Sequence, residues 1–303
     1  MVRKDDLMKK IFLIIISIIL LLTGCTTEEK VDNSEGEKLV VYTSFYPLYF
    51  LADEIGKDNI DLEIIIPNGM EPHDYEPSMK QLKDIKKADI FIYNGAGLES
   101  WADKLLNTII DEARVINASE EVELNKIDGV VDPHIWLDPH NMDKVGEKIK
   151  ECFISLDREN KEKYEDNYEK LSNKLVKLDK DYSMALKDKK RDKILVSHEA
   201  FGYMAERYNF EQIPVAGISP EQEPSPKTIA NIIDFSRKND FKYIFLETLA
   251  SPKTVNVIAE EAGLEILTLN PIGGLTKEEQ ENKEDYISIM EKNLDNLKKA
   301  LIE

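Results

Sequence analysis

The chain has 303 residues, with 40 lysines and arginines against 59 aspartates and glutamates, so its formal net charge is −19. This acidity argues against a nucleic-acid binder, because phosphate contacts need clustered Lys and Arg side chains. Two cysteines without a CxxC pair exclude a disulfide scaffold and a cysteine-rich zinc site. Hydrophobic residues make up 42% of the chain, which is too many for a disordered protein and enough for a substantial core.

Residues 1–24 have the pattern of a secretory signal peptide. Four basic residues precede the apolar run Ile11–Leu22, which at 12 residues is too short to cross a bilayer comfortably. The run ends in LTGC, which resembles the bacterial lipobox, whose cysteine is lipidated and becomes the first mature residue. We therefore expect lipid on Cys25. The alternative is a short N-terminal membrane anchor with an incidental cysteine.

Cleavage before Cys25 would change the length and the net charge of the protein. Removal of residues 1–24 leaves 279 residues and a net charge of −21. Lipid on Cys25 excludes an internal disulfide, so the fold must be held by packing alone. The polar stretch 25–38 predicts a flexible tether between lipid and domain. We expect a protein held by lipid on the extracytoplasmic face of the cell membrane.

From residue 39 onwards, short apolar runs alternate with helical patterns. The runs predict buried strands because they are short and rich in β-branched and aromatic residues. One set comprises 39–43, 62–66, 90–93 and 114–116, and a second comprises 194–197, 212–216, 243–246 and 265–269. Alternation of strands and helices predicts an α/β fold with parallel sheets.

Several helix ends are marked by capping residues. Two patterns are typical of a helix start. In one, serine, threonine or aspartate is followed directly by proline; in the other, such a residue is followed three positions later by Gln or Glu. The predicted starts are Ser78 with Gln81, Asp138-Pro139, Ser225-Pro226, Ser251-Pro252 and Thr276 with Glu279. Thr276 should open a C-terminal helix in which apolar residues from Tyr286 to Leu301 recur on one face. Gly263 should end another helix.

The segment from Asn160 to Asp188 differs from both strand sets. It contains no Gly or Pro, is heavily charged and repeats its apolar residues at helical spacing. One continuous helix would measure about 43 Å, longer than a small lobe. We expect a rigid helix that joins two α/β lobes; the alternative is two ordinary helices. The expected domains are a signal peptide (1–24), a tether (25–38), an N-terminal lobe (39–158), the linking helix (159–189) and a C-terminal lobe (190–303).

The four histidines carry most of the information about function. His73 and His198 closely follow predicted strands of different sets, so we expect them at the carboxyl ends of the two sheets, where α/β proteins bind ligands. A site that uses both must lie in the cleft between the lobes. A lone histidine is more often structural than a ligand. Here, however, three of the four histidines lie at junctions between secondary-structure elements, which weakens the structural interpretation. Three imidazoles suit Zn²⁺ well.

We do not expect His134 and His140 to bind the same ion. Six residues of strand span about 20 Å, and six residues of helix place two side chains on different faces. His140 falls in the first turn of a helix capped by Asp138, where free N–H groups and the helix dipole disfavour a cation. His134 is therefore the better ligand, and His140 is expected on the surface.

Five segments resemble one known family. GMEPHDYEPS, DPHIWLDP and SHEAFGYMAERY look like the three signature blocks of the bacterial zinc/manganese ABC-transporter solute-binding lipoproteins, and PEQEPSPKTI and FLETLASPKT resemble further stretches. The match runs in order from about Leu39 to the C-terminus, with the lipobox in front. The resemblance implies two α/β lobes joined by one long helix. It also implies a metal ion held between them and delivered to an ABC permease with its cytoplasmic ATPase.

By the matching blocks, the implied metal ligands are His73, His134 and His198. Manganese-type members tend to have an acidic residue where His198 stands, so the third imidazole favours Zn²⁺ over Mn²⁺. Gly273 stands where several relatives have a carboxylate ligand. The fourth position is then left to water or to a nearby carboxylate such as Glu247, which could equally orient a ligand or be purely structural. Residues 120–132 lack the histidine-rich loop of some zinc members, so loop-based metal capture is in doubt.

We predict a monomeric binding protein that captures Zn²⁺, and not an enzyme. Three histidines plus water also describe catalytic zinc, so a zinc hydrolase is the alternative of another class. Against it, the chain has no HExxH and no G-x-S-x-G motif, and its one evident base, Glu199, is expected in the first turn of a helix. Two further alternatives are a Mn²⁺ receptor of the same family and a surface adhesin with a structural metal.

Overall fold

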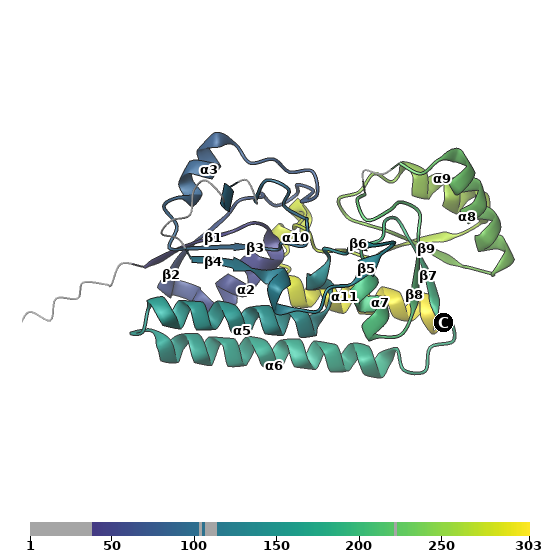
Figure 1. Cartoon of the computed structure of the whole chain (residues 1–303). Helices are drawn as coiled ribbons and strands as arrows, with labels where there is room; N and C mark the ends of the chain where they lie inside the picture. Colours follow the sequence, from purple (N-terminus) through teal and green to yellow (C-terminus); the bar gives the residue numbers. More distant parts are fainter. Residues whose placement is uncertain (1–37, 103–104, 107–113, 221–222) are drawn as a thin grey trace, which may run out of the picture. The chain divides into compact units, whose positions relative to one another are not determined.

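The computed structural model describes residues 38–102, 105–106, 114–220 and 223–303 (Figure 1). The predicted signal peptide, Cys25 and nearly all of the tether lie outside these residues. Residues 38–303 belong to one unit by their internal contacts. No helix in the described ranges combines the length and the apolar character needed to span a bilayer.

The first sheet has four parallel strands in the order β2–β1–β3–β4. Its central strand β3 is buried at every residue, as expected when helices and loops cover both faces. The strands are β1 (Leu39–Thr43), β2 (Ile60–Ile64), β3 (Ile90–Tyr93) and β4 (Arg114–Asn117), and the segments between them include α2 (Tyr46–Gly56), η1 (Lys57–Asn59) and α3 (Met79–Ile85).

The second sheet is also parallel, in the order β10–β9–β7–β8. It is formed by β7 (Lys193–Val196), β8 (Glu211–Pro214), β9 (Tyr243–Leu246) and β10 (Glu265–Thr268), with α7 (Gly202–Arg207), α8 (Pro226–Lys238) and α9 (Lys253–Ala262) between them. The segment between the sheets also contains η2 (Ala118–Glu121) and a short antiparallel hairpin, β5 (Lys126–Ile127) and β6 (Val130–Val131). The predicted α/β class with two parallel-sheet lobes is confirmed. The strand boundaries shift by at most two residues.

One long helix, α6 (Lys161–Ala185), runs beneath both sheets (Figure 1). It packs on α2 and α5 (Pro139–Leu156) beside the first sheet and on α11 (Tyr286–Leu301) beside the second. Its buried residues lie on one stripe, and the hydroxyl of Tyr182 donates a hydrogen bond to Met290 O in α11 at 2.6 Å. At 25 residues the helix measures about 37 Å. The alternative of two helices in this segment is wrong.

The hydrophobic core is shared between the lobes. Its largest cluster joins Val41 of β1, Val196 of β7, Tyr182 of α6 and Leu297 of α11. Each sheet also has a smaller cluster of its own, around Phe91 in one lobe and in the other around residues of β7, β9 and α9. Because apolar surface from both sheets is buried in a single cluster, separating the lobes would expose part of the core to water.

Most capping predictions are confirmed, and two need correction. The Thr276–Glu279 box opens only α10 (Lys277–Glu281); the chain then turns through Lys283 at φ 55°, and Asp285 caps a separate helix, α11. The helix α9 begins one residue later than expected, because its first backbone hydrogen bond runs from Asn256 N to Pro252 O. The Ser251 side chain therefore caps nothing.

Two Ser-Pro pairs that look alike in sequence should respond differently to mutation. Ser225 Oγ accepts a hydrogen bond from Thr228 N at 3.1 Å, whereas α9 has no side-chain cap. We expect Ser225→Ala to lower the free energy of unfolding by about 1 kcal/mol. Ser251→Ala should change it by less than about 0.5 kcal/mol. Urea unfolding followed by circular dichroism measures both, and equal losses would contradict the assigned caps.

Candidate metal centre

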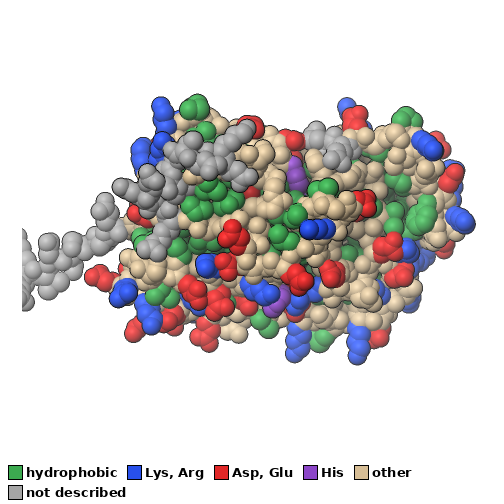
Figure 2. Space-filling model, viewed as in Figure 1, with side chains coloured by type: hydrophobic (Ala, Val, Ile, Leu, Met, Phe, Trp, Pro, Cys, Tyr) green, Lys and Arg blue, Asp and Glu red, His purple; other side chains and the backbone are tan. Residues whose placement is uncertain are grey.

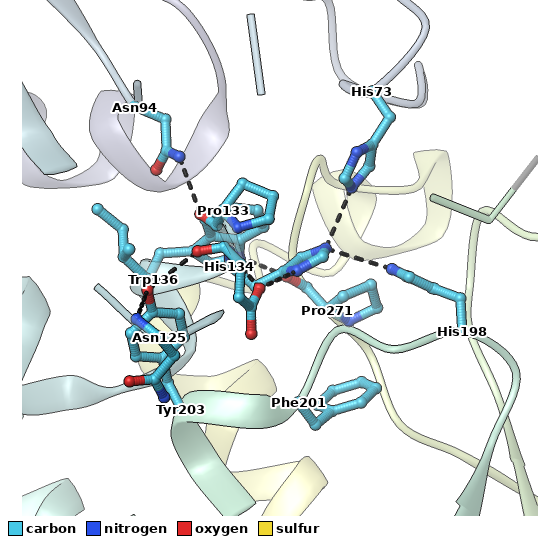
Figure 3. A network of polar contacts seen from close by, with 12 residues as sticks. His73, Asn94, Asn125, Pro133, His134, Trp136, His198, Phe201, Tyr203 and Pro271 are labelled. Atoms are coloured by element: carbon cyan, nitrogen blue, oxygen red, sulfur yellow. Dashed lines mark hydrogen bonds and ion pairs between the residues drawn. The ribbon is translucent and has the colours of Figure 1, made fainter. Parts of the chain in front are cut away.

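Three of the four histidines meet at one point between the two sheets (Figure 3). His73 lies in the loop after β2, His134 precedes the 3-10 turn η3 (Ile135–Leu137), and His198 lies in the bend after β7. The Nε2 atom of His134 is 3.1 Å from His73 Nε2 and 3.3 Å from His198 Nε2. In a tetrahedral zinc site with bonds near 2.0–2.1 Å, two ligand nitrogens lie about 3.3 Å apart. The two separations from His134 Nε2 therefore fit a tetrahedral zinc site, and ligand atoms of all three histidines lie within 4.8 Å of one another.

His140 takes no part in this cluster. It is exposed in the first turn of α5, where its N–H donates to Asp138 Oδ1 at 2.8 Å. The predicted capping role of Asp138 and the surface position of His140 are both confirmed. Among the described residues, the three histidines are the one group of three or more metal-binding side chains that converge.

A buried carboxylate fixes the orientation of His134. Asp132 Oδ1 lies 2.7 Å from His134 Nδ1 and also accepts the backbone N–H of His134 at 3.0 Å. Because Oδ1 is an acceptor, Nδ1 carries the proton and Nε2 presents its lone pair to the other two imidazoles. Burial, followed by the neighbouring His198, lowers the pKa of His134 well below its ordinary value, so the ring is neutral. Burial also raises the pKa of Asp132 to about 7.

The loop that carries His134 is held from both lobes. Asn94, which follows β3, donates its side-chain N–H to Pro133 O at 2.9 Å. Tyr203 in α7 donates its hydroxyl to Asp132 O at 2.9 Å. These two bonds place the central imidazole of the cluster relative to both sheets.

Glu247 lies behind His198 rather than beside the converging nitrogens. Its Oε1 is 2.5 Å from His198 Nδ1, a close contact that falls outside the angles of a directed hydrogen bond. The same oxygen accepts the Ser197 hydroxyl and the backbone N–H of His198 at 3.2 Å. Glu247 is thus at the far nitrogen of His198 and is not a member of the three-histidine cluster.

The cluster lines a small pocket with room for about one water-sized particle. Glu71 and Trp136 contribute to it from the first half of the chain, and Thr248 and Gly273 from the second half. Burial and the two neighbouring imidazoles lower the pKa of His73 to about 2, while burial raises the pKa of Glu71 to about 7. Figure 2 shows histidine atoms within the hollow between the lobes, with acidic and basic side chains interspersed around it.

Asp132 was not predicted to be part of this site. An acid two residues before a candidate ligand is nevertheless a recognisable indication, because ligand imidazoles usually donate their second N–H to a carboxylate or carbonyl. The prediction that Glu199 lies in the first turn of a helix is wrong. Residues 197–199 form a bend, α7 begins only at Gly202, and the Glu199 N–H donates to Gly217 O at 3.0 Å.

Two parallel-sheet lobes with a histidine-lined pocket between them define a two-lobed α/β binding protein. Comparisons with known proteins identify the family. A family model described as zinc-uptake complex component A, periplasmic (ZnuA), matches residues 41–300. The high-affinity zinc uptake system protein ZnuA of Bacillus subtilis is 36% identical over 95% of this chain and 96% of its own length. The chain belongs to the ZnuA family.

Two streptococcal proteins are also similar. The zinc-binding lipoprotein AdcA of Streptococcus pneumoniae is 35% identical over 97% of this chain, which spans 61% of AdcA. The Zn(II)-bound ZnuA-like domain of AdcA has a TM-score of 0.80 at 36% identity, covering 88% of this chain and 100% of that domain. The laminin-binding protein Lmb of Streptococcus agalactiae has a TM-score of 0.80 at 30% identity, covering 86% of this chain and 99% of Lmb.

The two tryptophans allow a test of how the pocket is held together. Trp136 Nε1 donates to Pro271 O at 2.6 Å and so links the His134 loop to the loop after β10, whereas Trp101 Nε1 is buried with no partner among the described residues. We expect Trp136→Phe to cost about 1–3 kcal/mol, because Pro271 O loses its donor. Trp101→Phe loses no such bond and should cost clearly less. Urea unfolding compares the two, and a larger loss for Trp101→Phe would contradict the link.

Proposed function

We propose that this protein captures Zn²⁺ between its lobes with the Nε2 atoms of His73, His134 and His198 and delivers the ion to an ABC permease for import. The separations of His134 Nε2 from the Nε2 atoms of His73 and His198 carry this proposal, because both fit a tetrahedral zinc site. The loop that carries His134 is held by hydrogen bonds from both lobes, so little ordering of this ring is needed when the ion binds. The family description and the zinc-uptake name of the B. subtilis relative support the same function.

The ligand set supports Zn²⁺ over Mn²⁺. Imidazole nitrogen suits zinc, whereas manganese favours carboxylate and water oxygens. The three-histidine cluster contains no carboxylate. The hydrolase alternative receives no support from the family, whose description is that of a component of zinc uptake.

We further propose that lipid on Cys25 holds the protein at the extracytoplasmic face of the membrane, with residues 25–38 as a tether. The lipobox-like LTGC supports this location, as do the lipoprotein name of AdcA and the periplasmic description of the family. The division into lobes at 39–158 and 190–303, with a linking helix over 159–189, belongs to the same proposal. The position of α6 supports it.

Metal binding by single variants tests the proposed ligands. His73→Ala, His134→Ala and His198→Ala should each weaken Zn²⁺ binding by more than 100-fold, beyond the range found for groups that only support a ligand. His140→Ala should stay within about twofold of the parent. Titration of metal-free protein in competition with a chromophoric chelator measures the affinity. Parent-like binding by all three variants would contradict the site, and preferential loading of Mn²⁺ from an equimolar mixture would contradict the metal.

The same variants test delivery. In cells that lack this protein, the parent and His140→Ala should restore zinc uptake, and His134→Ala should not. Uptake restored by His134→Ala would contradict the proposed route through the site.

Two substitutions of Glu247 test whether its carboxylate orients His198 or binds the zinc ion itself. A glutamine side chain keeps an oxygen that can face His198 Nδ1 and accept the backbone N–H of His198, whereas alanine has none. If Glu247 orients His198, we expect Glu247→Ala to weaken zinc binding about 10–100-fold and Glu247→Gln clearly less. Equal, large losses in both variants would instead identify the carboxylate as a ligand.

Adhesion is a second candidate function, favoured by one relative. The S. agalactiae Lmb structure is described as that of a bifunctional protein with adhesin and metal-transporting activity. Solid-phase binding of laminin to the metal-free and zinc-loaded protein tests whether the likeness extends to that activity. Binding by neither form would leave transport as the single candidate.

A further inference from the structure

The chain contains the pair Asn-Gly twice, at residues 68–69 and 94–95. Asparagine amides are chemically labile, and they are most labile before glycine, which leaves the next backbone nitrogen unhindered. Loss of the amide requires this nitrogen to reach Cγ of the asparagine side chain. A hydrogen bond on the nitrogen, or tight burial of the amide, therefore prevents the reaction.

The pair at 94–95 is protected by the fold. Asn94 is fully buried, and its Nδ2 donates to Gly95 O at 3.1 Å and to Pro133 O at 2.9 Å. The Gly95 N–H donates to Glu99 Oε2 at 3.0 Å. Both groups that would react are already held in other contacts.

The pair at 68–69 lies open in the loop after β2, five residues before His73. Met70 N donates to Pro67 O at 3.2 Å, which closes a tight turn around the pair. Gly69 is exposed at φ 84°, and a Cβ built there would meet nothing within 4 Å. Within the described ranges, the Gly69 N–H donates no backbone hydrogen bond. The attacking nitrogen is thus unhindered.

A backbone donor from the other lobe activates the Asn68 amide. The Leu275 N–H, in the loop after β10, donates to Asn68 Oδ1 at 3.1 Å. Negative charge develops on Oδ1 when a nitrogen adds to Cγ, and a donor already directed at that oxygen stabilises the charge. The same hydrogen bond joins the loop that carries His73 to the second lobe.

We propose that Asn68 is a site of spontaneous deamidation and that the isoaspartate formed there displaces the loop that carries His73. The Gly69 nitrogen forms a bond to Asn68 Cγ while its proton passes through water to the amide nitrogen. The Cγ–Nδ2 bond breaks, and ammonia leaves a cyclic imide. Water then opens the imide. Attack at Cγ gives aspartate, and attack at the main-chain carbonyl of residue 68 gives isoaspartate.

The isoaspartate changes the length of the main chain. Its main chain runs through the former side chain of residue 68 and is one atom longer. The loop is fixed by β2 at one end and by the Ser78 cap of α3 at the other, so the extra atom must shift residues between them. His73 lies among these residues, and we expect weaker zinc binding; this consequence rests on the proposed function.

Incubation of metal-free protein at mildly alkaline pH tests the modification, because base promotes loss of the proton from the attacking nitrogen. Peptide mapping by mass spectrometry follows both Asn-Gly pairs, in buffer and in urea. We expect Asn68 to convert in the folded protein at a rate no lower than in urea, and Asn94 to convert only in urea. Asn68→Gln should not convert. An unchanged Asn68 in the folded protein would overturn the proposal, and a lower rate than in urea would exclude activation by the Leu275 N–H.

Zinc affinity tests the displacement of the loop. The isoaspartyl form, separated by ion exchange, is compared with Asn68→Asp, which has the same charge and an ordinary main chain. We expect the isoaspartyl form to bind Zn²⁺ about tenfold more weakly than Asn68→Asp, as when a group that supports a ligand is removed. Equal affinities would exclude the displacement. Failure of the fresh parent to bind Zn²⁺ would contradict the proposed function, whereas the conversion of Asn68 is measured without metal and is judged separately.

Discussion

The candidate site depends on one buried hydrogen bond, from His134 Nδ1 to Asp132 Oδ1. Both side chains are almost completely removed from solvent, so no water can substitute for either partner. The bond fixes the tautomer of His134 and directs its Nε2 lone pair at the other two imidazoles, 3.1 and 3.3 Å away. Imidazole nitrogens that crowd together at one point are unfavourable by themselves and become favourable when a cation binds between them, which is why the arrangement indicates a metal.

The rest of the fold keeps this group in place. The lobes share one hydrophobic cluster and pack on the same helix, α6, so the loops at the ends of their sheets cannot shift freely against each other. Tyr286 in α11 extends the connection by donating its hydroxyl to Trp136 O, two residues after His134. A site that uses side chains from both lobes therefore needs little rearrangement to bind its ion.

Sequence patterns predicted the helix starts correctly where the start depends only on residues close together in the chain. The Ser78, Asp138 and Ser225 caps formed as predicted, because a capping hydrogen bond involves residues only two or three apart. The errors occurred where a short-range pattern was ambiguous. Ser251 looks like Ser225 in sequence, yet α9 starts one residue later, and the Thr276 box opens a short helix that ends before α11. Glu199 was misplaced because residues 197–199 bend to bring His198 into the cleft.

The sequence by itself determined the α/β class and the long helix, because the alternation of strands and helices, helical periodicity and caps can be recognised locally. Local patterns and the resemblance of three blocks to a known family together gave the choice of His73, His134 and His198 over His140. Only the tertiary structure decided that the three Nε2 atoms meet, that Asp132 supports His134 and that Glu247 lies behind His198. The contacts among the three histidines and Glu247 join residues 49, 61 and 64 positions apart. Contacts between distant segments depend on how two sheets pack on one helix, and no local pattern encodes that packing.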